Sequence, residues 1–176
     1  MKMTRIILAV LGLVVVTSAQ NVSYNFDQGA DFSKFRSYKW VEIPGGVTLD
    51  DLTTRQLTSA LEAELGMKGL AKTDSDSADL YIGYQVATSQ EKEITAYNTG
   101  WGYGARWGGM GTTSISTNTL TIGSLALDMY DSSQKQLVWR GVATKTLDPG
   151  AKTEKRQKNI QKGAEKLLKN YPPKKK

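Results

Sequence analysis

The residues best suited to contact a ligand lie in one glycine- and aromatic-rich segment, residues 100–111. Trp101, Tyr103 and Trp107 carry flat rings that can stack on a sugar, a lipid or a nucleic-acid base, and Arg106 adds a positive charge. A dinucleotide fingerprint is excluded because Trp107 stands where its third glycine belongs, and no Gly-Lys-Ser/Thr follows to hold phosphate. One interpretation of this segment is a ligand-binding loop. The interpretation that we favour is a long hairpin connection whose rings fold back over the edge of a sheet.

The chain contains no histidine and no cysteine. Catalytic triads, thiol nucleophiles and the usual transition-metal ligand sets depend on these residues, so the sequence excludes them together. Disulfide bonds are excluded for the same reason. We therefore predict a protein that is not an enzyme and that has no catalytic residues, metal ligands or cofactor.

Carboxylates still leave one enzymatic alternative open, because glycoside hydrolysis needs only two acidic groups that face each other across a cleft. The candidates are Asp79, Glu91, Glu93 and Asp128. A hydrolase that uses Asp79 and Asp128 is the alternative function. We favour a structural role for both, because acids at strand ends and turns commonly accept hydrogen bonds from backbone N–H groups.

Residues 74–79, with the sequence Asp-Ser-Asp-Ser-Ala-Asp, superficially match a calcium loop. An EF-hand loop needs an oxygen ligand at its fifth position and glycine at its sixth, where this chain has Ala78 and Asp79. The segment is therefore predicted to be a polar turn that precedes a strand.

The N-terminal segment has the three parts of a secretory signal peptide. Lys2 and Arg5 supply positive charge, residues 6–16 form an apolar run, and Ala19 is a small residue at the expected cleavage site. The apolar run has 11 residues, whereas a membrane-spanning helix needs roughly 20. We predict cleavage after Ala19 and export to the periplasm or the medium, with no transmembrane segment in the mature chain.

The positive charge is concentrated at the C-terminus. Residues 151–176 contain ten Lys/Arg and two Asp/Glu, whereas residues 20–150 contain eleven and fifteen. A basic C-terminal helix that binds anionic lipid or nucleic acid is a second alternative function. We favour an ordinary solvated helix face and expect no nucleic-acid partner.

Hydrophobic periodicity predicts one domain over residues 20–171, followed by a disordered basic tail at 172–176. Extended segments are expected at 22–26, 38–42, 79–87, 120–130 and 136–144, with a bulge near Gly123, and helices at 48–70 and 152–170. Thr48 or Asp50 can cap the first helix. Trp139 is expected in the core, and Arg140 on the open face or paired with an acid.

This order of elements predicts an α+β fold: a mostly antiparallel sheet of about four strands, two helices packed on one face, and a long glycine- and aromatic-rich hairpin loop.

Several segments together resemble a family of bacterial envelope proteins, many of them lipoproteins, known as domain of unknown function 4136. The matching segments are residues 24–27, 31–40, 78–80, the glycine-aromatic loop, 137–141 and 171–173. The resemblance implies no catalytic residues. Members often carry a cysteine for lipid attachment directly after the signal, where this chain has Gln20. We predict an exported cell-envelope accessory or binding protein whose partner is an unidentified envelope protein, glycan or lipid.

Overall fold

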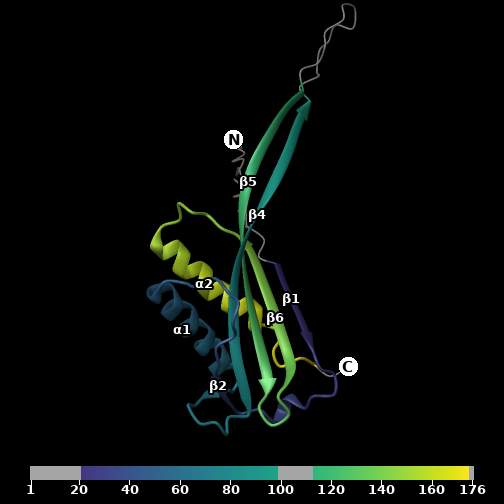
Figure 1. Cartoon of the computed structure of the whole chain (residues 1–176), viewed down its shortest axis with the longest axis vertical. Helices are drawn as coiled ribbons and strands as arrows, with labels where there is room; N and C mark the ends of the chain where they lie inside the picture. The colour runs from purple at the N-terminus through teal and green to yellow at the C-terminus, as the bar shows by residue number, and fades with distance from the viewer. Residues whose placement is uncertain (1–20, 99–112, 175–176) are drawn as a thin grey trace, which may run out of the picture.

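The computed structural model describes residues 21–98 and 113–174, so the predicted signal peptide lies outside the described residues. Figure 1 shows a curved sheet with two helices on one side and a narrow two-stranded extension at one end. The elements are β1 (Asn21–Phe26), a 3-10 turn (Phe32–Lys34), β2 (Ser37–Trp40), α1 (Asp51–Met67), β3 (Ala71–Lys72), β4 (Leu80–Asn98), β5 (Thr113–Asp131), β6 (Gln136–Thr146) and α2 (Thr153–Leu168).

The strands form one six-stranded sheet in the order β1-β6-β5-β4-β2-β3. The predicted α+β class and the two helices are confirmed, but the prediction of about four mostly antiparallel strands is wrong. The sheet is mixed, because β2 pairs in parallel with both β3 and β4. Alternation of apolar residues reports which face of a strand is buried. It does not report the partner strand or its direction, and β3 is too short to alternate.

Helix α1 begins at the second of the two predicted caps. The Asp50 carboxylate accepts a hydrogen bond from the backbone N–H of Thr53 at 2.9 Å, which satisfies an otherwise unpaired donor. Leu57, Leu61 and Leu65 then lie on one buried face at helical spacing. The chain leaves the helix through Gly69, whose positive φ of 83° suits glycine.

Both helices cover the same face of the sheet, where the core lies. Ala164, Leu167 and Leu168 of α2 join the leucines of α1 over a layer of buried strand residues. That layer contains Leu80, Ile82, Leu127, Met129, Trp139 and Ala143. Trp139 is fully buried, as predicted.

Two of the strands are much longer than predicted. β4 and β5 pair without interruption over 19 residues each, from Leu80 opposite Asp131 to Asn98 opposite Thr113. The bulge expected near Gly123 is also wrong, because the β5 register shift occurs between Met129 and Tyr130. The apolar alternation changes near Gly123 for another reason: Leu125 is the first residue of β5 that packs against the core, and residues 117–122 before it are exposed or half-buried.

Candidate functional site

The most prominent feature of the described structure is a two-stranded ribbon, formed by the end of β4 and the beginning of β5. On the side of β4 that faces away from β5, the backbone hydrogen bond nearest to the ribbon runs from Val47 N–H to the Val86 carbonyl at 2.7 Å. On the other side, Leu147 N–H donates to the Thr121 carbonyl, also at 2.7 Å. Beyond these points the two strands pair only with each other among the described residues. The ribbon, residues 91–98 of β4 and 113–120 of β5, projects from the sheet in Figure 1.

The length of the ribbon sets what it can reach. Eight residues from Glu91 to Asn98, at about 3.3 Å per residue, span about 26 Å. A two-stranded hairpin on its own is marginally stable in water, because neither face is buried and both edges leave backbone groups unpaired. The described side chains between Ala87 and Glu93 are all exposed. A third strand laid against either edge would stabilise the ribbon.

The predicted ligand contacts Trp101, Tyr103, Arg106 and Trp107 lie outside the described residues, so the binding-loop hypothesis stays a prediction. The two strands that flank this segment end at Asn98 and begin at Thr113, and these residues are paired at the far end of the ribbon. The chain therefore enters and leaves the predicted loop about 26 Å beyond the last point at which β6 and the segment after it pair with β5.

Asp79, the first acid of the hydrolase alternative, holds the start of β2. One of its carboxylate oxygens accepts hydrogen bonds from the backbone N–H of Arg36 at 2.8 Å and from the N–H and hydroxyl of Ser37, each at 2.9 Å. The Ser37 hydroxyl in turn accepts from the Asp79 N–H. These donors, the Arg36 N–H foremost, lower the pKa of Asp79.

Replacing Asp79 by alanine is expected to lower the free energy of unfolding by about 2 kcal/mol at neutral pH, because three hydrogen bonds to a carboxylate are lost. A lowered folded pKa means that this stabilisation is complete above the unfolded pKa of about 3.9 and disappears as the pH falls through the folded value. Urea unfolding of the unmodified protein and of Asp79→Ala, at pH 7 and near pH 2.5, measures this difference in the free energy of unfolding. An equal difference at the two pH values would contradict a role for the ionised carboxylate.

Asp128, the second acid, is 1% exposed and forms a two-pronged ion pair with Arg140. Arg140 Nε donates to one carboxylate oxygen at 2.5 Å and Nη2 to the other at 2.6 Å. The prediction that Arg140 pairs with an acid is confirmed. The strand register places Asp128 opposite Gly83, four residues along β4 from Asp79, a separation of about 13 Å. Both carboxylates are therefore engaged in structural contacts, and they lie well apart along the sheet.

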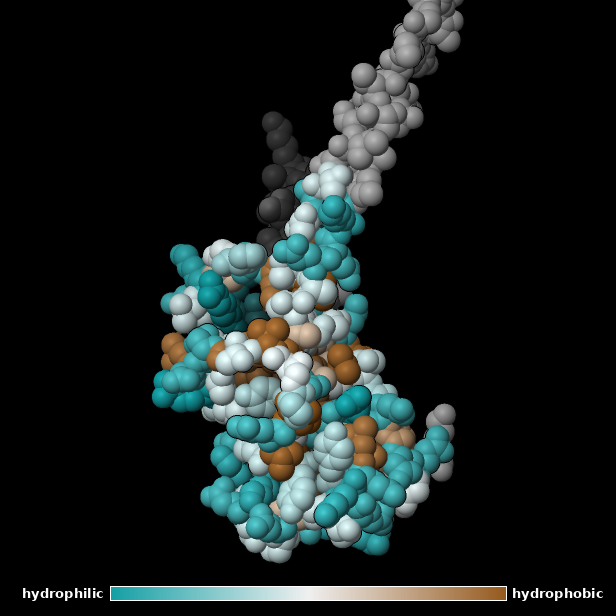
Figure 2. Space-filling view, viewed as in Figure 1, coloured by the Kyte–Doolittle hydropathy of each residue, from teal (hydrophilic) through white to brown (hydrophobic). Residues whose placement is uncertain are grey.

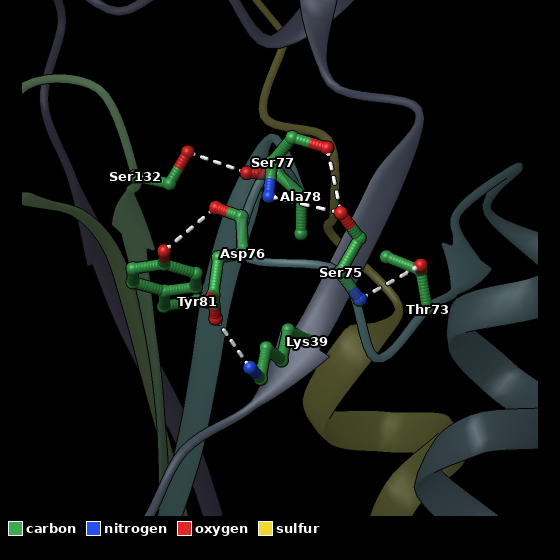
Figure 3. A network of polar contacts seen from close by, with 8 residues as sticks. All are labelled: Lys39, Thr73, Ser75, Asp76, Ser77, Ala78, Tyr81 and Ser132. Carbon is green, nitrogen blue, oxygen red and sulfur yellow. Dashed lines mark hydrogen bonds and ion pairs between the residues drawn. The ribbon is translucent and has the colours of Figure 1, made fainter.

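Hydrogen bonds and an ion pair, several of them with residues outside the turn, hold the polar turn predicted at residues 74–79 (Figure 3). The Asp76 carboxylate pairs with Lys39 Nζ at 2.5 Å, and the Asp76 carbonyl accepts from the Tyr81 hydroxyl at 2.9 Å. The Ser75 and Ser77 hydroxyls bond to each other. Within the described ranges no three acids lie close enough together to hold a metal ion. These contacts account for the turn as a structural connection into β4.

Two grooves mark the described surface. One of about 580 Å³ runs between α1 and α2, lined by Leu52, Arg55, Gln157 and their neighbours. The other, of about 380 Å³, lies beside Phe32, Phe35, Tyr171 and the following prolines. Burial raises the pKa of Tyr171, and its hydroxyl, sealed from solvent, has no hydrogen-bond partner among the described residues. That hydroxyl therefore offers no contact to a molecule in the second groove.

A mixed sheet, covered on one face by two helices and prolonged by a two-stranded ribbon, defines a small α+β domain. The chain belongs to the family described as "Domain of unknown function (DUF4136)", which matches residues 22–173. No significant match was found among curated proteins. In the described part of the chain, no helix combines the length and apolar character that crossing a membrane requires.

Two solved structures share the fold at low sequence identity. A PDZ domain protein from Parabacteroides distasonis superposes with a TM-score of 0.54 at 14% identity, over 91% of this chain and 38% of that one. This chain thus spans well under half of that protein. The PelC dodecamer from Paraburkholderia phytofirmans gives a TM-score of 0.50 at 12% identity, over 85% of this chain and 95% of that one. These similarities establish the fold alone.

Proposed function

We propose that this protein is an exported, non-catalytic accessory protein of the cell envelope that binds its partner through the edge of the β4–β5 ribbon. The observation that carries the proposal is the ribbon itself, which leaves two long strand edges unpaired in the described structure. The export signal predicted from residues 1–19 supports the location. The engagement of Asp79 and Asp128 in structural contacts supports a role without catalysis.

The outer edge of β5 is the better binding edge. Proteins normally protect an exposed edge with lysine, proline, a bulge or a very short strand. Residues 113–123 of β5 contain no charged residue and no proline, and they are rich in threonine, serine and isoleucine. The matching stretch of β4 carries Glu91, Lys92 and Glu93. A strand from a partner could therefore pair with the β5 edge more favourably than with the charged β4 edge.

The hydrogen-bonding pattern shows which β5 backbone groups face outward. The Thr121 carbonyl points away from β4, because it accepts from Leu147 N–H. Backbone direction alternates along a strand, so the N–H and C=O of Thr119 and Thr117 point outward as well, whereas those of Asn118 point toward Glu93 on β4. Thr119 and Thr117 are thus positioned to bind an added strand.

A second copy of the same chain is the partner to test first. PelC, which shares this fold, is described as a dodecamer. A ribbon from another copy supplies strands of matching length, and pairing β5 of one copy with β4 of the next gives a head-to-tail contact that can close into a ring.

Replacing Thr119 by proline is expected to weaken partner binding at least tenfold and to leave the ribbon paired, because it removes an outward N–H and no hydrogen bond to β4. Sedimentation velocity measures self-association, and a pulldown from envelope fractions measures other partners. Asn118→Pro is the matched control, which breaks a β4–β5 hydrogen bond and is expected to disturb the ribbon itself. Assembly and capture that are unchanged in Thr119→Pro would overturn edge binding.

The same assay tests the aromatic loop predicted from the sequence. The variant that replaces Trp101, Tyr103 and Trp107 by alanine leaves the β5 edge as it is. Loss of the partner in this variant, with normal binding by Thr119→Pro, would move the binding site from the edge to the loop.

A further inference from the structure

The outer face of α2 and its C-cap carries a continuous row of exposed lysines: Lys155, Lys158, Lys162 and Lys166 in the helix and Lys169 at the cap. At 100° per residue they fall within an arc of about 80°. That arc lies opposite the face that places Ala164, Leu167 and Leu168 in the core. We call this row the lysine face.

A sixth lysine extends the face onto the sheet. Lys145 of β6 is half-buried, and its Nζ donates to the Asn159 side chain of α2 at 2.6 Å. Desolvation and the nearby positive charges of Lys155, Lys166 and Lys162 lower the pKa of Lys145. The like charges are therefore close enough to repel one another.

Acidic residues only partly compensate this charge. Between residues 145 and 169 there are eight Lys/Arg and three Asp/Glu. Asp148 pairs with Lys155 at 2.8 Å, whereas Glu154 and Glu165 lie at the margin of the lysine arc. The middle of the face, Lys158, Lys162 and Lys166, makes no ion pair in the described structure. Figure 2 shows hydrophilic residues over the exposed end of α2.

We propose that the lysine face docks on an anionic lipid surface. The row from Lys155 to Lys169 extends over about 21 Å, which suits a flat array of phosphate headgroups better than a single small anion. Each lysine near such a surface adds to the attraction. The apolar face of α2 stays in the core, so the helix binds without inserting. No aromatic ring stands in the lysine row to stack on bases, which disfavours single-stranded nucleic acid.

The test uses protein purified from cells that express the full chain, sedimented with vesicles of phosphatidylcholine and phosphatidylglycerol in equal parts, or of phosphatidylcholine alone. Binding is expected only to the anionic vesicles and is expected to weaken steeply with added salt. The triple variant Lys158→Gln/Lys162→Gln/Lys166→Gln is expected to lose at least tenfold in affinity, and replacement of the same three lysines by arginine is expected to retain it.

The matched control is Lys34→Gln/Lys92→Gln/Lys174→Gln, which removes the same net charge from three exposed lysines outside the lysine face. It is expected to bind anionic vesicles nearly as well as the unmodified protein. An equal loss in both triple variants would show that net charge alone drives binding. Equal binding to neutral vesicles, or displacement by duplex DNA at equal phosphate concentration, would also overturn the proposal. The ribbon is untouched in the lysine-face variant, so partner binding through β5 is measured independently.

Discussion

Replacing Gly141 by alanine is expected to lower the free energy of unfolding by about 3 kcal/mol. Gly141 lies on β6, on the face of the sheet that packs against α2. A β-carbon there would overlap the Trp139 ring and stand 2.9 Å from Leu167 Cδ1. Trp139 and Leu167 are both buried, so neither can move into solvent. In a domain of this size that loss lowers the melting temperature by about 8 °C, which thermal unfolding followed by tryptophan fluorescence measures.

The control for this substitution is Gly66→Ala in α1. A β-carbon at Gly66 meets nothing within 4 Å, and alanine is favoured over glycine in a helix by about 1 kcal/mol. The two glycine substitutions should therefore have opposite signs. Adding Leu167→Val to Gly141→Ala should recover part of the loss, because it frees space beside the new methyl group. An unchanged melting temperature in Gly141→Ala would mean that the Trp139 ring and Leu167 do not pack over Gly141 as described.

The parts of the fold that could be predicted are the elements whose residues pack in the core with a regular spacing along the sequence. The leucine spacing in α1, the cap at Asp50 and the hairpin of β5 and β6 all follow from periodicity and capping. The parallel pairing of β2 with β4 could not be predicted, because Tyr38 and Leu80 meet across more than forty residues of intervening chain.

The ribbon was missed for a related reason. Apolar alternation marks a strand with one buried face, and the described ribbon side chains at residues 91–93 and 117–119 are exposed on both faces. A signal was nonetheless present: residues 113–122 are rich in β-branched threonine and isoleucine and contain neither glycine nor proline. For the candidate acids, residue type alone could not show that Asp79 would accept hydrogen bonds from the N–H groups of Arg36 and Ser37, because that contact depends on the parallel pairing of β2 with β4.

Replacing Arg140 by alanine is expected to lower the free energy of unfolding by about 3 kcal/mol, more than replacing its partner Asp128 by alanine. The two side chains form one ion pair, but they differ in exposure: 1% for Asp128 and 47% for Arg140. Loss of Arg140 leaves a buried carboxylate without a partner, which is strongly destabilising. Loss of Asp128 leaves an arginine that water can solvate, so we expect a cost of about 1 kcal/mol.

The reason Asp128 stays buried on the face away from the helices lies on the neighbouring strand. Gly83 stands opposite Asp128, and the Ile43 side chain occupies the space where a β-carbon of Gly83 would lie. Because Ile43 covers Gly83 beside Asp128, water reaches the Asp128 carboxylate poorly in the Arg140→Ala variant. Urea unfolding of both single variants and of Asp128→Ala/Arg140→Ala measures the coupling. The double variant should be more stable than Arg140→Ala alone, because it removes the stranded charge. If it is less stable, the carboxylate is hydrated in the single variant and the pair acts as an ordinary surface ion pair.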